Sequence, residues 1–410
     1  MRMLLYIDPG TGSMLFSIVI GLVTMLYFVG KAALIKLKFI VTGGKNTIKS
    51  GNRVAFAIYS EGVQYWNVFK PILDEFEKRQ IQVSYLTSSE QDPFFSTPYE
   101  HITGEFIGTG NKAFVRLNFL EADICLMTTP GLDVYQLKRS RGVRYYVHIL
   151  HAPGDATGYR LFGIDYFDAV LLTGEYQKAH IKLLEEKRNL PPKELFVVGC
   201  PYLDVLQGKI SHIQAMKQGH LTVLVAPSWG PSGILSKYGR KLLDPLVQSG
   251  FHVIVRPHPQ SKSSEMSIIE RLVGQYGGIP NIEWDYTSEN LAALARADIM
   301  ISDFSGVIFD YVFLFDRPFM YVNAEFDAKP YDAWDIPEKP WKLRILPEIG
   351  IELKESTFAS IKGIIEEACQ NVVLSDNRRK ARDTAWQFRG ESGRRTVDFL
   401  LEKQTDLLGR

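Results

Sequence analysis

The sequence predicts an α/β protein with two doubly wound domains that face each other across a cleft, preceded by one N-terminal transmembrane helix. The chain has 410 residues, which is more than one ordinary hydrophobic core supports. Short apolar segments alternate with helical ones in two series, as in parallel sheets covered by helices on both faces. An uncharged run precedes both series. We therefore expect a membrane anchor and linker at 1–50, an N-terminal domain at 51–205, a C-terminal domain at 206–375 and closing helices at 376–410.

The uncharged run occupies residues 13–30. At about 1.5 Å per residue it extends about 27 Å, close to the thickness of the hydrocarbon core of a membrane. Lysines follow the run at 31, 36 and 38, so the positive-inside rule places the later domains in the cytoplasm. The flank before the run lacks the basic start of a signal peptide, and no cleavage site follows it. A helix lying in the membrane interface stays an alternative.

The first α/β series begins with a strand predicted at 54–59, where an apolar run ends in Ser-Glu-Gly, a turn sequence. Apolar residues then recur at helical spacing over 63–79. The remaining predicted elements are strands at 83–86, 124–127, 145–150, 169–172 and 195–198 and a helix at 176–186. A polar stretch at 204–220 ends the series.

The second series repeats this alternation. Its predicted strands lie at 221–225, 253–255, 282–284, 299–301 and 319–322. Its predicted helices lie near 236–249, 265–276 and 289–296, and a further helix starts at Ser305. Two closing helices are expected at 378–388 and 394–403.

The composition excludes several classes of protein. With 47 basic and 46 acidic residues, the formal net charge is +1, so nothing predicts a nucleic-acid partner. The three cysteines lie far apart, which is unlike a disulfide framework or a zinc site. The eight histidines form no recognisable metal motif, so we predict no metal.

Two motifs in the second series predict a binding site for a phosphorylated, nucleotide-linked ligand. Arg-Pro-His-Pro at 256–259 and Ile-Ser-Asp-Phe-Ser-Gly-Val-Ile-Phe-Asp at 301–310 both follow apolar strands. The carboxyl ends of such strands form the ligand crevice of an α/β sheet. A helix starting at Ser305 and Gly306 would direct free N–H groups toward a phosphate.

Each residue of these motifs also has a plain structural interpretation. Arg256 could pair with a phosphate, and His258 could contact the ligand or hold its own loop. Asp303 or Ser305 could simply cap the helix. Asp310 could accept ribose hydroxyls or be a surface residue. The remaining residues assigned to this donor side are Ser302, Gly306, Pro227 and Ser228, the last two from the loop after the strand at 221–225.

The first domain offers a second candidate at the end of its predicted strand at 145–150. His148 and His151 are three residues apart, so a strand would direct them to opposite faces. We expect His148 in the core and His151 at the cleft, where it could act as a general base toward an alcohol. Gly154 and Asp155 would lie on the same acceptor side, with Asp155 orienting the histidine or binding substrate.

The order of these motifs resembles the CDP-glycerol glycerophosphotransferase family, of the teichoic-acid primase and polymerase type. Besides the two motifs above, the resemblance rests on Ala-Pro-Ser-Trp at 226–229, Asp-Arg-Pro at 316–318 and Gln-Phe-Arg-Gly-Glu-Ser-Gly-Arg at 387–394. It extends over about 53–400 and is strongest over 221–322. Two departures concern the site, since the loop at 151–155 lacks the family's His-Gly-Thr-Pro and Gly306 replaces a serine.

This resemblance implies two Rossmann-like domains of the GT-B type and transfer of glycerol phosphate from CDP-glycerol to a hydroxyl of a lipid-linked glycan or polymer, with release of CMP. It implies catalytic roles for His151, on the acceptor hydroxyl, and for His258, near the donor pyrophosphate. Ser305 and Gly306 would hold the phosphates. The location implied is the bacterial cytoplasmic membrane, with the catalytic domains on the cytoplasmic face. A GT-B nucleotide-sugar glycosyltransferase and a non-catalytic nucleotide-binding assembly subunit stay alternatives.

Overall fold

The computed structural model describes residues 53–210, 213, 220–287, 289–323 and 326–409, together with helical residues at 20, 22–27 and 29–30. The chain forms two units, 1–52 and 53–410. In the described parts, no helix has the length and apolar character needed to cross a membrane. Half of the predicted span at 13–30 lies outside the described residues, and it therefore stays a prediction.

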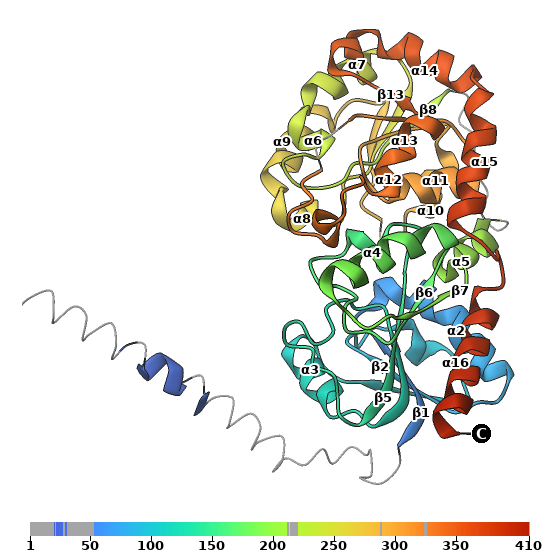
Figure 1. Cartoon of the computed structure of the whole chain (residues 1–410). Coiled ribbons are helices and arrows are strands. Elements are labelled where there is room, and N and C mark those ends of the chain that lie inside the picture. Colours follow the sequence, from blue (N-terminus) through green and yellow to red (C-terminus); the bar gives the residue numbers. More distant parts are fainter. Residues whose placement is uncertain are drawn as a thin grey trace, which may run out of the picture. The chain divides into compact units, whose positions relative to one another are not determined.

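The first domain is built on a seven-stranded parallel sheet in the order β3-β2-β1-β4-β5-β6-β7 (Figure 1). Its strands are β1 (Val54–Ser60), β2 (Val83–Thr87), β3 (Ile102–Phe106), β4 (Ala122–Met127), β5 (Val143–Ile149), β6 (Ala169–Leu172) and β7 (Glu194–Val197). The sheet order reverses between β1 and β4, so a ligand crevice is expected at the carboxyl ends of these strands.

Helices cover both faces of this sheet because successive strand residues point to opposite sides. They are α2 (Trp66–Lys78), α3 (Asn111–Asn118), α4 (Lys178–Arg188) and α5 (Pro201–Ile210). On one face Phe56 and Ile58 pack with α2, and on the other Ala57 and Tyr59 pack with α3 and α4. A short 3-10 helix, η1 (Val63–Tyr65), leads into α2.

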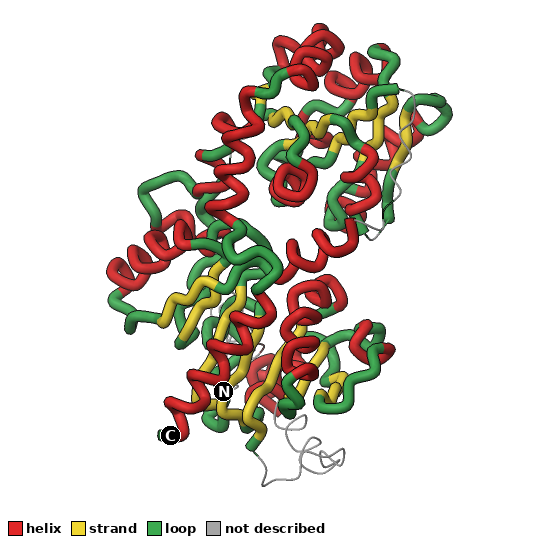
Figure 2. The backbone as a smooth tube through the Cα atoms, turned by 90° about the vertical axis from the view of Figure 1, so that its right-hand side faces the viewer, coloured by secondary structure: helices red, strands yellow, loops and turns green. Residues whose placement is uncertain are grey.

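The second domain contains a six-stranded parallel sheet in the order β10-β9-β8-β11-β12-β13. Its strands are β8 (Thr222–Val225), β9 (His252–Val255), β10 (Ile282–Trp284), β11 (Ile299–Ser302), β12 (Phe319–Tyr321) and β13 (Ile351–Glu352). Both sheets are flanked by helices, as the colours of Figure 2 show. The predicted α/β class with two Rossmann-like, parallel-sheet domains is thus confirmed.

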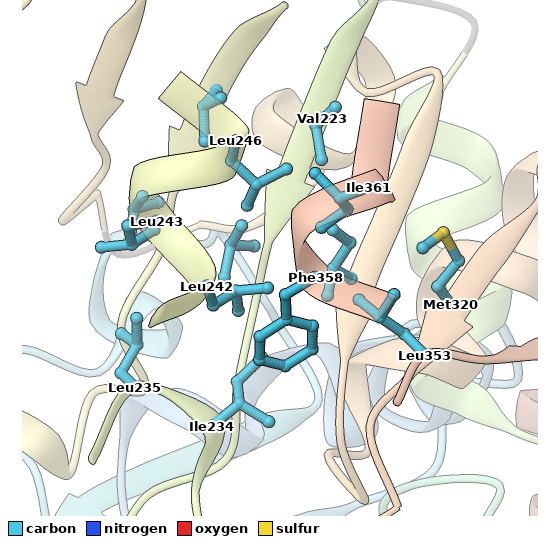
Figure 3. Close-up of a cluster of buried hydrophobic side chains, with 14 of the residues drawn as sticks. Val223, Ile234, Leu235, Leu242, Leu243, Leu246, Met320, Leu353, Phe358 and Ile361 are labelled. Carbon is cyan, nitrogen blue, oxygen red and sulfur yellow. The ribbon is translucent and has the colours of Figure 1, made fainter. Parts of the chain in front are cut away.

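The helices of the second domain lie in two layers. One layer contains α7 (Arg240–Gln248), α9 (Met266–Tyr276) and α14 (Ile361–Gln370). Figure 3 shows side chains of α7 and of the segment leading into α14 packed together around Phe358. The other contains α10 (Leu291–Arg296), α11 (Val307–Phe315), α13 (Leu346–Ile349) and α15 (Val373–Ala385). Three single-turn helices complete the domain, α6 (Ile234–Lys237), α8 (Ser261–Ser264) and α12 (Trp341–Arg344).

The last helix returns to the first domain. After α15, α16 (Ser392–Leu408) packs against α2, beside which it lies in Figure 1. Gly393 makes this approach possible, because a Cβ atom there would lie 2.3 Å from the carbonyl oxygen of Pro71. Asp204 of α5 accepts hydrogen bonds from Trp386 and Gly390, in the turn between α15 and α16. The predicted domain boundary at 205–206 therefore falls within α5.

A segment of the second domain is bound tightly to the first. The side chain of Asp332 is fully buried and accepts the backbone N–H groups of Phe162 and Gly163. Arg188, at the end of α4, contacts Asp332 at 2.8 Å, Asp335 at 2.7 Å and, within its own domain, Asp165 at 2.7 Å. These polar contacts, which cross between the domains, hold the segment carrying Asp332 and Asp335 against the first domain.

Candidate active site

Side chains from both domains line a cleft with a volume of about 650 Å³. The first domain contributes η1 and the start of α2, with Gln64, Trp66 and Asn67. The second domain contributes the loops that follow its strands. Five of the predicted donor-side residues line this cleft, namely Pro227, Arg256, His258, Ser305 and Gly306.

The start of α11 supplies hydrogen-bond donors to the cleft. Gly306 precedes the helix with a helical backbone, φ −61°, and Val307 is its first residue. In the described part of the chain, the N–H groups of Gly306 and Val307 have no hydrogen-bond acceptor. Two unpaired N–H groups at the positive end of a helix dipole are well suited to a phosphate. This arrangement agrees with the predicted phosphate-binding role of Gly306.

Asp303 holds the loops of the site together. Its carboxylate accepts the N–H groups of Ser228 at 2.9 Å, Ile234 at 3.1 Å and Ser305 at 3.2 Å. Burial raises the pKa of Asp303, and the hydrogen bonds from Ser228 and Ile234 oppose the increase. The carboxylate therefore joins the loop after β8 to the loop after β11, and α11 itself, which begins at Val307, has no side-chain cap. Ser302 joins the same two strands by donating to the carbonyl of Ala226 at 2.6 Å.

Arg256 lies at the cleft, but its guanidinium is already engaged. It pairs with Asp285 at 2.5 Å and also donates to the side chain and the carbonyl of Thr287. Burial by itself would raise the pKa of Asp285, but hydrogen bonds from Thr287 and Arg256 lower it. Asp285 directly follows β10, the neighbour of β9, so both partners come from adjacent strand ends. The observed role of Arg256 is to fix the loop that carries His258.

His258 presents one ring nitrogen to the cleft. Its Nδ1 accepts the N–H of Gln260 at 3.1 Å, so the proton of the neutral ring is on Nε2. Burial lowers the pKa of His258, with a smaller opposing effect from Glu265. At neutral pH, His258 is therefore an uncharged hydrogen-bond donor through Nε2, held in place by its own loop.

Asp310 is buried behind the wall of the cleft, so the alternative of a surface residue is wrong. Its Oδ2 accepts the hydroxyl of Tyr202 and the Nδ2 of Asn290, each at 3.1 Å. Burial raises the pKa of Asp310 to about 7, and both hydrogen bonds oppose that increase. Tyr202 and Asn290 line the cleft themselves, so Asp310 positions two cleft residues that the sequence did not indicate.

His151 lies in the loop after β5, and the residues that line the cleft do not include it, so its expected position at the cleft stays a prediction. Its ring packs edge-on against Tyr65, with 5.5 Å between the ring centres, and Tyr65 lies between the wall residues Gln64 and Trp66. Its Nδ1 is 3.2 Å from the hydroxyl of Tyr159 and 3.3 Å from that of Thr128. Burial lowers the pKa of His151 to about 4. The ring is therefore neutral at pH 7.

The other first-domain predictions have mixed outcomes. His148 is fully buried, which confirms its expected place in the core. The carbonyl of Gly154 accepts hydrogen bonds from Tyr176 and Gln177. Asp155 accepts the N–H groups of Trp341 at 2.8 Å and Lys342 at 2.9 Å, and so caps α12 of the second domain. Its observed contacts belong to the domain interface.

No cluster of metal-binding side chains was predicted. Within the described residues, no group of three or more His, Cys, Asp or Glu side chains is arranged to hold a metal ion. The hydrogen-bond donors of this cleft include the N–H groups at the start of α11 and Nε2 of His258.

Two parallel-sheet, Rossmann-like domains that share a cleft define a GT-B-like fold. Residues 173–334 match the family described as CDP-glycerol:poly(glycerophosphate) glycerophosphotransferase. The family predicted from the sequence motifs is confirmed over this segment. The matched segment covers less than half of the chain, and most of it lies in the second domain. No curated protein sequence matches the chain.

Solved structures show the same fold at low sequence identity. The structure of the wall teichoic acid polymerase TagF has a TM-score of 0.57 and 14% identity, over 93% of this chain and 98% of that chain. A putative UDP-N-acetylglucosamine 2-epimerase from Listeria monocytogenes has a TM-score of 0.57 and 11% identity, over 88% and 98%. The UDP-GlcNAc 2-epimerase of Methanocaldococcus jannaschii has a TM-score of 0.54 and 13% identity, over 85% and 100%.

Proposed function

We propose that this protein transfers glycerol phosphate, or a related polyol phosphate, from a CDP-linked donor to a hydroxyl group of a lipid-linked glycan or cell-surface polymer, releasing CMP. The observation that carries this proposal is the placement of the Gly306 and Val307 N–H groups and the ring of His258 in one cleft. Together they offer three hydrogen-bond donors to a diphosphate.

The reaction is a displacement at phosphorus. The acceptor oxygen forms a bond to the phosphorus that carries glycerol, while the bond from that phosphorus to the oxygen of CMP breaks. Negative charge spreads over the phosphoryl oxygens and the leaving oxygen in the transition state. Donors that are already in place stabilise this charge without reorganising, which is the usual source of catalysis in such sites. The acceptor also loses its proton, and the family resemblance implies that His151 takes it.

We further propose that the uncharged run at 13–30 anchors the protein in the bacterial cytoplasmic membrane, with both α/β domains on the cytoplasmic face. A lipid-linked acceptor would then lie in the same membrane. In cells producing the full chain, we expect the protein in the membrane fraction, and a chain lacking residues 1–30 in the supernatant. Equal distribution of the two chains between the fractions would contradict the anchor.

The donor class can be tested without an acceptor. We would measure binding of CDP-glycerol, CDP-ribitol, CMP and UDP-N-acetylglucosamine to the purified protein by calorimetry. The informative variant is His258→Asn, because the Asn side-chain oxygen can still accept the N–H of Gln260 while the Nε2 donor is lost. We expect selective binding of a CDP-polyol, weakened about tenfold in this variant through loss of one hydrogen bond to a charged group.

A matched control is His220→Asn, at an exposed position outside the cleft, which should bind like the unmodified protein. Preference for the uridine nucleotide would indicate a nucleotide-sugar glycosyltransferase. CDP-polyol binding without CMP release in the presence of membranes carrying polymer acceptor would indicate a non-catalytic subunit. Unchanged affinity in His258→Asn would refute the placement of the diphosphate.

A further inference from the structure

One wall of the cleft consists of uncharged side chains. This wall, which we call the first-domain wall, is formed by Val63, Gln64, Trp66, Asn67 and Pro93. The first four belong to η1 and to the start of α2. Two of the five side chains are amides, one is an indole and two are apolar. The wall shares the cleft with the second-domain loops that carry the proposed phosphate donors, so it is the surface left for the second substrate.

The cations of the cleft already have partners. Among the described residues that line it, the cationic ones are Arg256 and Lys209. Arg256 pairs with Asp285, and Nζ of Lys209 lies 3.0 Å from the carboxylate of Glu289, which lines the cleft as well. His258 is uncharged at neutral pH, as shown above. The lining therefore offers N–H groups to one diphosphate and has no unpaired cation for a second anion.

The two possible acceptor classes differ in charge at the end that reacts. The terminal hydroxyl of a glycerol phosphate polymer belongs to a glycerol that also carries a phosphodiester, so an anion would enter the cleft together with that hydroxyl. A sugar at the end of a glycan brings no charge. Proteins bind phosphates with Arg and Lys side chains, and like charges placed side by side in a site strongly weaken binding. The charges of the cleft therefore favour the sugar.

The side chains of the first-domain wall match the surface of a sugar ring. Trp66 is half-buried, and its ring packs edge-on against Tyr85, with 6.5 Å between the ring centres. Nε1 of Trp66 and the amide of Asn67 form no hydrogen bond with any described residue. A sugar ring has C–H groups that pack on an aromatic ring and hydroxyls that pair with an amide or an indole N–H. Ligand sites commonly combine aromatic contacts with a few such polar groups.

We propose that the acceptor hydroxyl belongs to an uncharged sugar ring bound on the first-domain wall, where Trp66 packs against the ring and Asn67 pairs with its hydroxyls. The proposal rests on the transferase function proposed above and names its acceptor class. The bonds formed and broken are those of the proposed reaction. Its product ends in a polyol that carries a phosphodiester, which the wall does not fit. The protein therefore adds the first polyol phosphate to a glycan and does not lengthen the polymer.

Binding can be tested without turnover. Saturation-transfer difference NMR on the full-length protein, with CMP present, compares the methyl glycosides of glucose, N-acetylglucosamine and N-acetylmannosamine with a trimer of glycerol phosphate. We expect at least one glycoside to bind and the trimer to bind at least about tenfold more weakly. Binding of the trimer as tightly as the best glycoside, or binding of no glycoside, would overturn the proposal.

Substitutions in the wall show where the glycoside binds. We expect Trp66→Leu and Asn67→Ala each to weaken its binding about fivefold or more, through loss of a ring contact or of a hydrogen bond, whereas Trp66→Phe keeps most of the affinity. The matched control is Trp334→Leu, at an exposed tryptophan outside the cleft lining, which should bind like the unmodified protein. Calorimetry with CDP-glycerol should give the same affinity for all four variants. An equal loss of CDP-glycerol and glycoside binding in Trp66→Leu would assign the wall to the donor and refute the proposal.

The product of turnover separates this inference from the proposed function. After incubation with CDP-glycerol and membranes carrying lipid-linked glycan, mass spectrometry shows whether the new glycerol phosphate is esterified to a sugar or to a glycerol. We expect a single unit on a sugar, and a chain of units would overturn the acceptor class alone. If the unmodified protein releases no CMP, the proposed function fails, while the binding experiment still tests the sugar site.

Discussion

Substitution of Asp310 by Asn should change how the stability of the protein depends on pH. Burial raises the pKa of Asp310 to about 7 in the folded state, against an ordinary value of 3.8 for an exposed aspartate. Between about pH 4 and pH 7 the folded state therefore holds one proton that the unfolded state has lost. The free energy of unfolding then falls by about 1.4 kcal/mol for each unit by which the pH rises in this window. From pH 4 to pH 7 the total decrease is about 4 kcal/mol.

Asn has nearly the shape of Asp and never ionises, so Asp310→Asn removes this pH dependence and keeps an oxygen that accepts from Tyr202 or Asn290. Urea unfolding of both proteins from pH 4 to pH 9 measures the effect. The difference in free energy of unfolding should shift in favour of the variant by about 4 kcal/mol from pH 4 to pH 7 and stay constant above pH 7. Taking the difference cancels titrations common to both proteins. A flat difference, or a shift completed below pH 5, would refute the buried, proton-binding state of Asp310.

Two further substitutions test the contacts between the domains. Arg188→Met should lower the free energy of unfolding by about 3–5 kcal/mol, because three carboxylates near the domain interface lose their partner. Urea unfolding measures this change. A decrease in the free energy of unfolding below about 1 kcal/mol would show that water replaces the hydrogen bonds that the three carboxylates lose. Gly393→Ala should lower stability by about 1–3 kcal/mol through the clash with Pro71. Gly363→Ala in α14, where a Cβ would meet nothing, is its control and should be neutral or stabilising by up to about 1 kcal/mol. Equal effects of the two glycine substitutions would contradict the close packing of α16.

The alternation of apolar and helical segments predicted most of the fold because the two sheets are parallel and buried on both faces. Such strands are continuous apolar runs, which are easy to recognise. The strand β3 was not predicted, since only Ile102 of its five residues is buried and it lies at the edge of the sheet. The strand β13 has two residues and is equally hard to recognise.

The candidate site shows where sequence patterns stop being informative. The helix start at Gly306 and the loop of His258 could be predicted, because each directly follows an apolar strand. The partners that define their chemistry could not, since they come from other strands and helices. Asp285 engages Arg256 only because β9 and β10 are neighbours, and Asp310 is reached by Tyr202 from α5. Those pairings become visible only when the strand order is known.

Asp204 of α5 accepts hydrogen bonds from Trp386, Gly390 and Ser392, where the chain returns from α15 of the second domain to α16 on the first. Two bodies joined by one flexible tether can swivel in every direction. Where hydrogen bonds instead fix the connection at one point, the motion between the domains is mainly a rotation about that point. Any opening of the cleft should therefore turn about Asp204 and Trp386, and it must also break the contacts of Asp332 with Phe162 and Gly163.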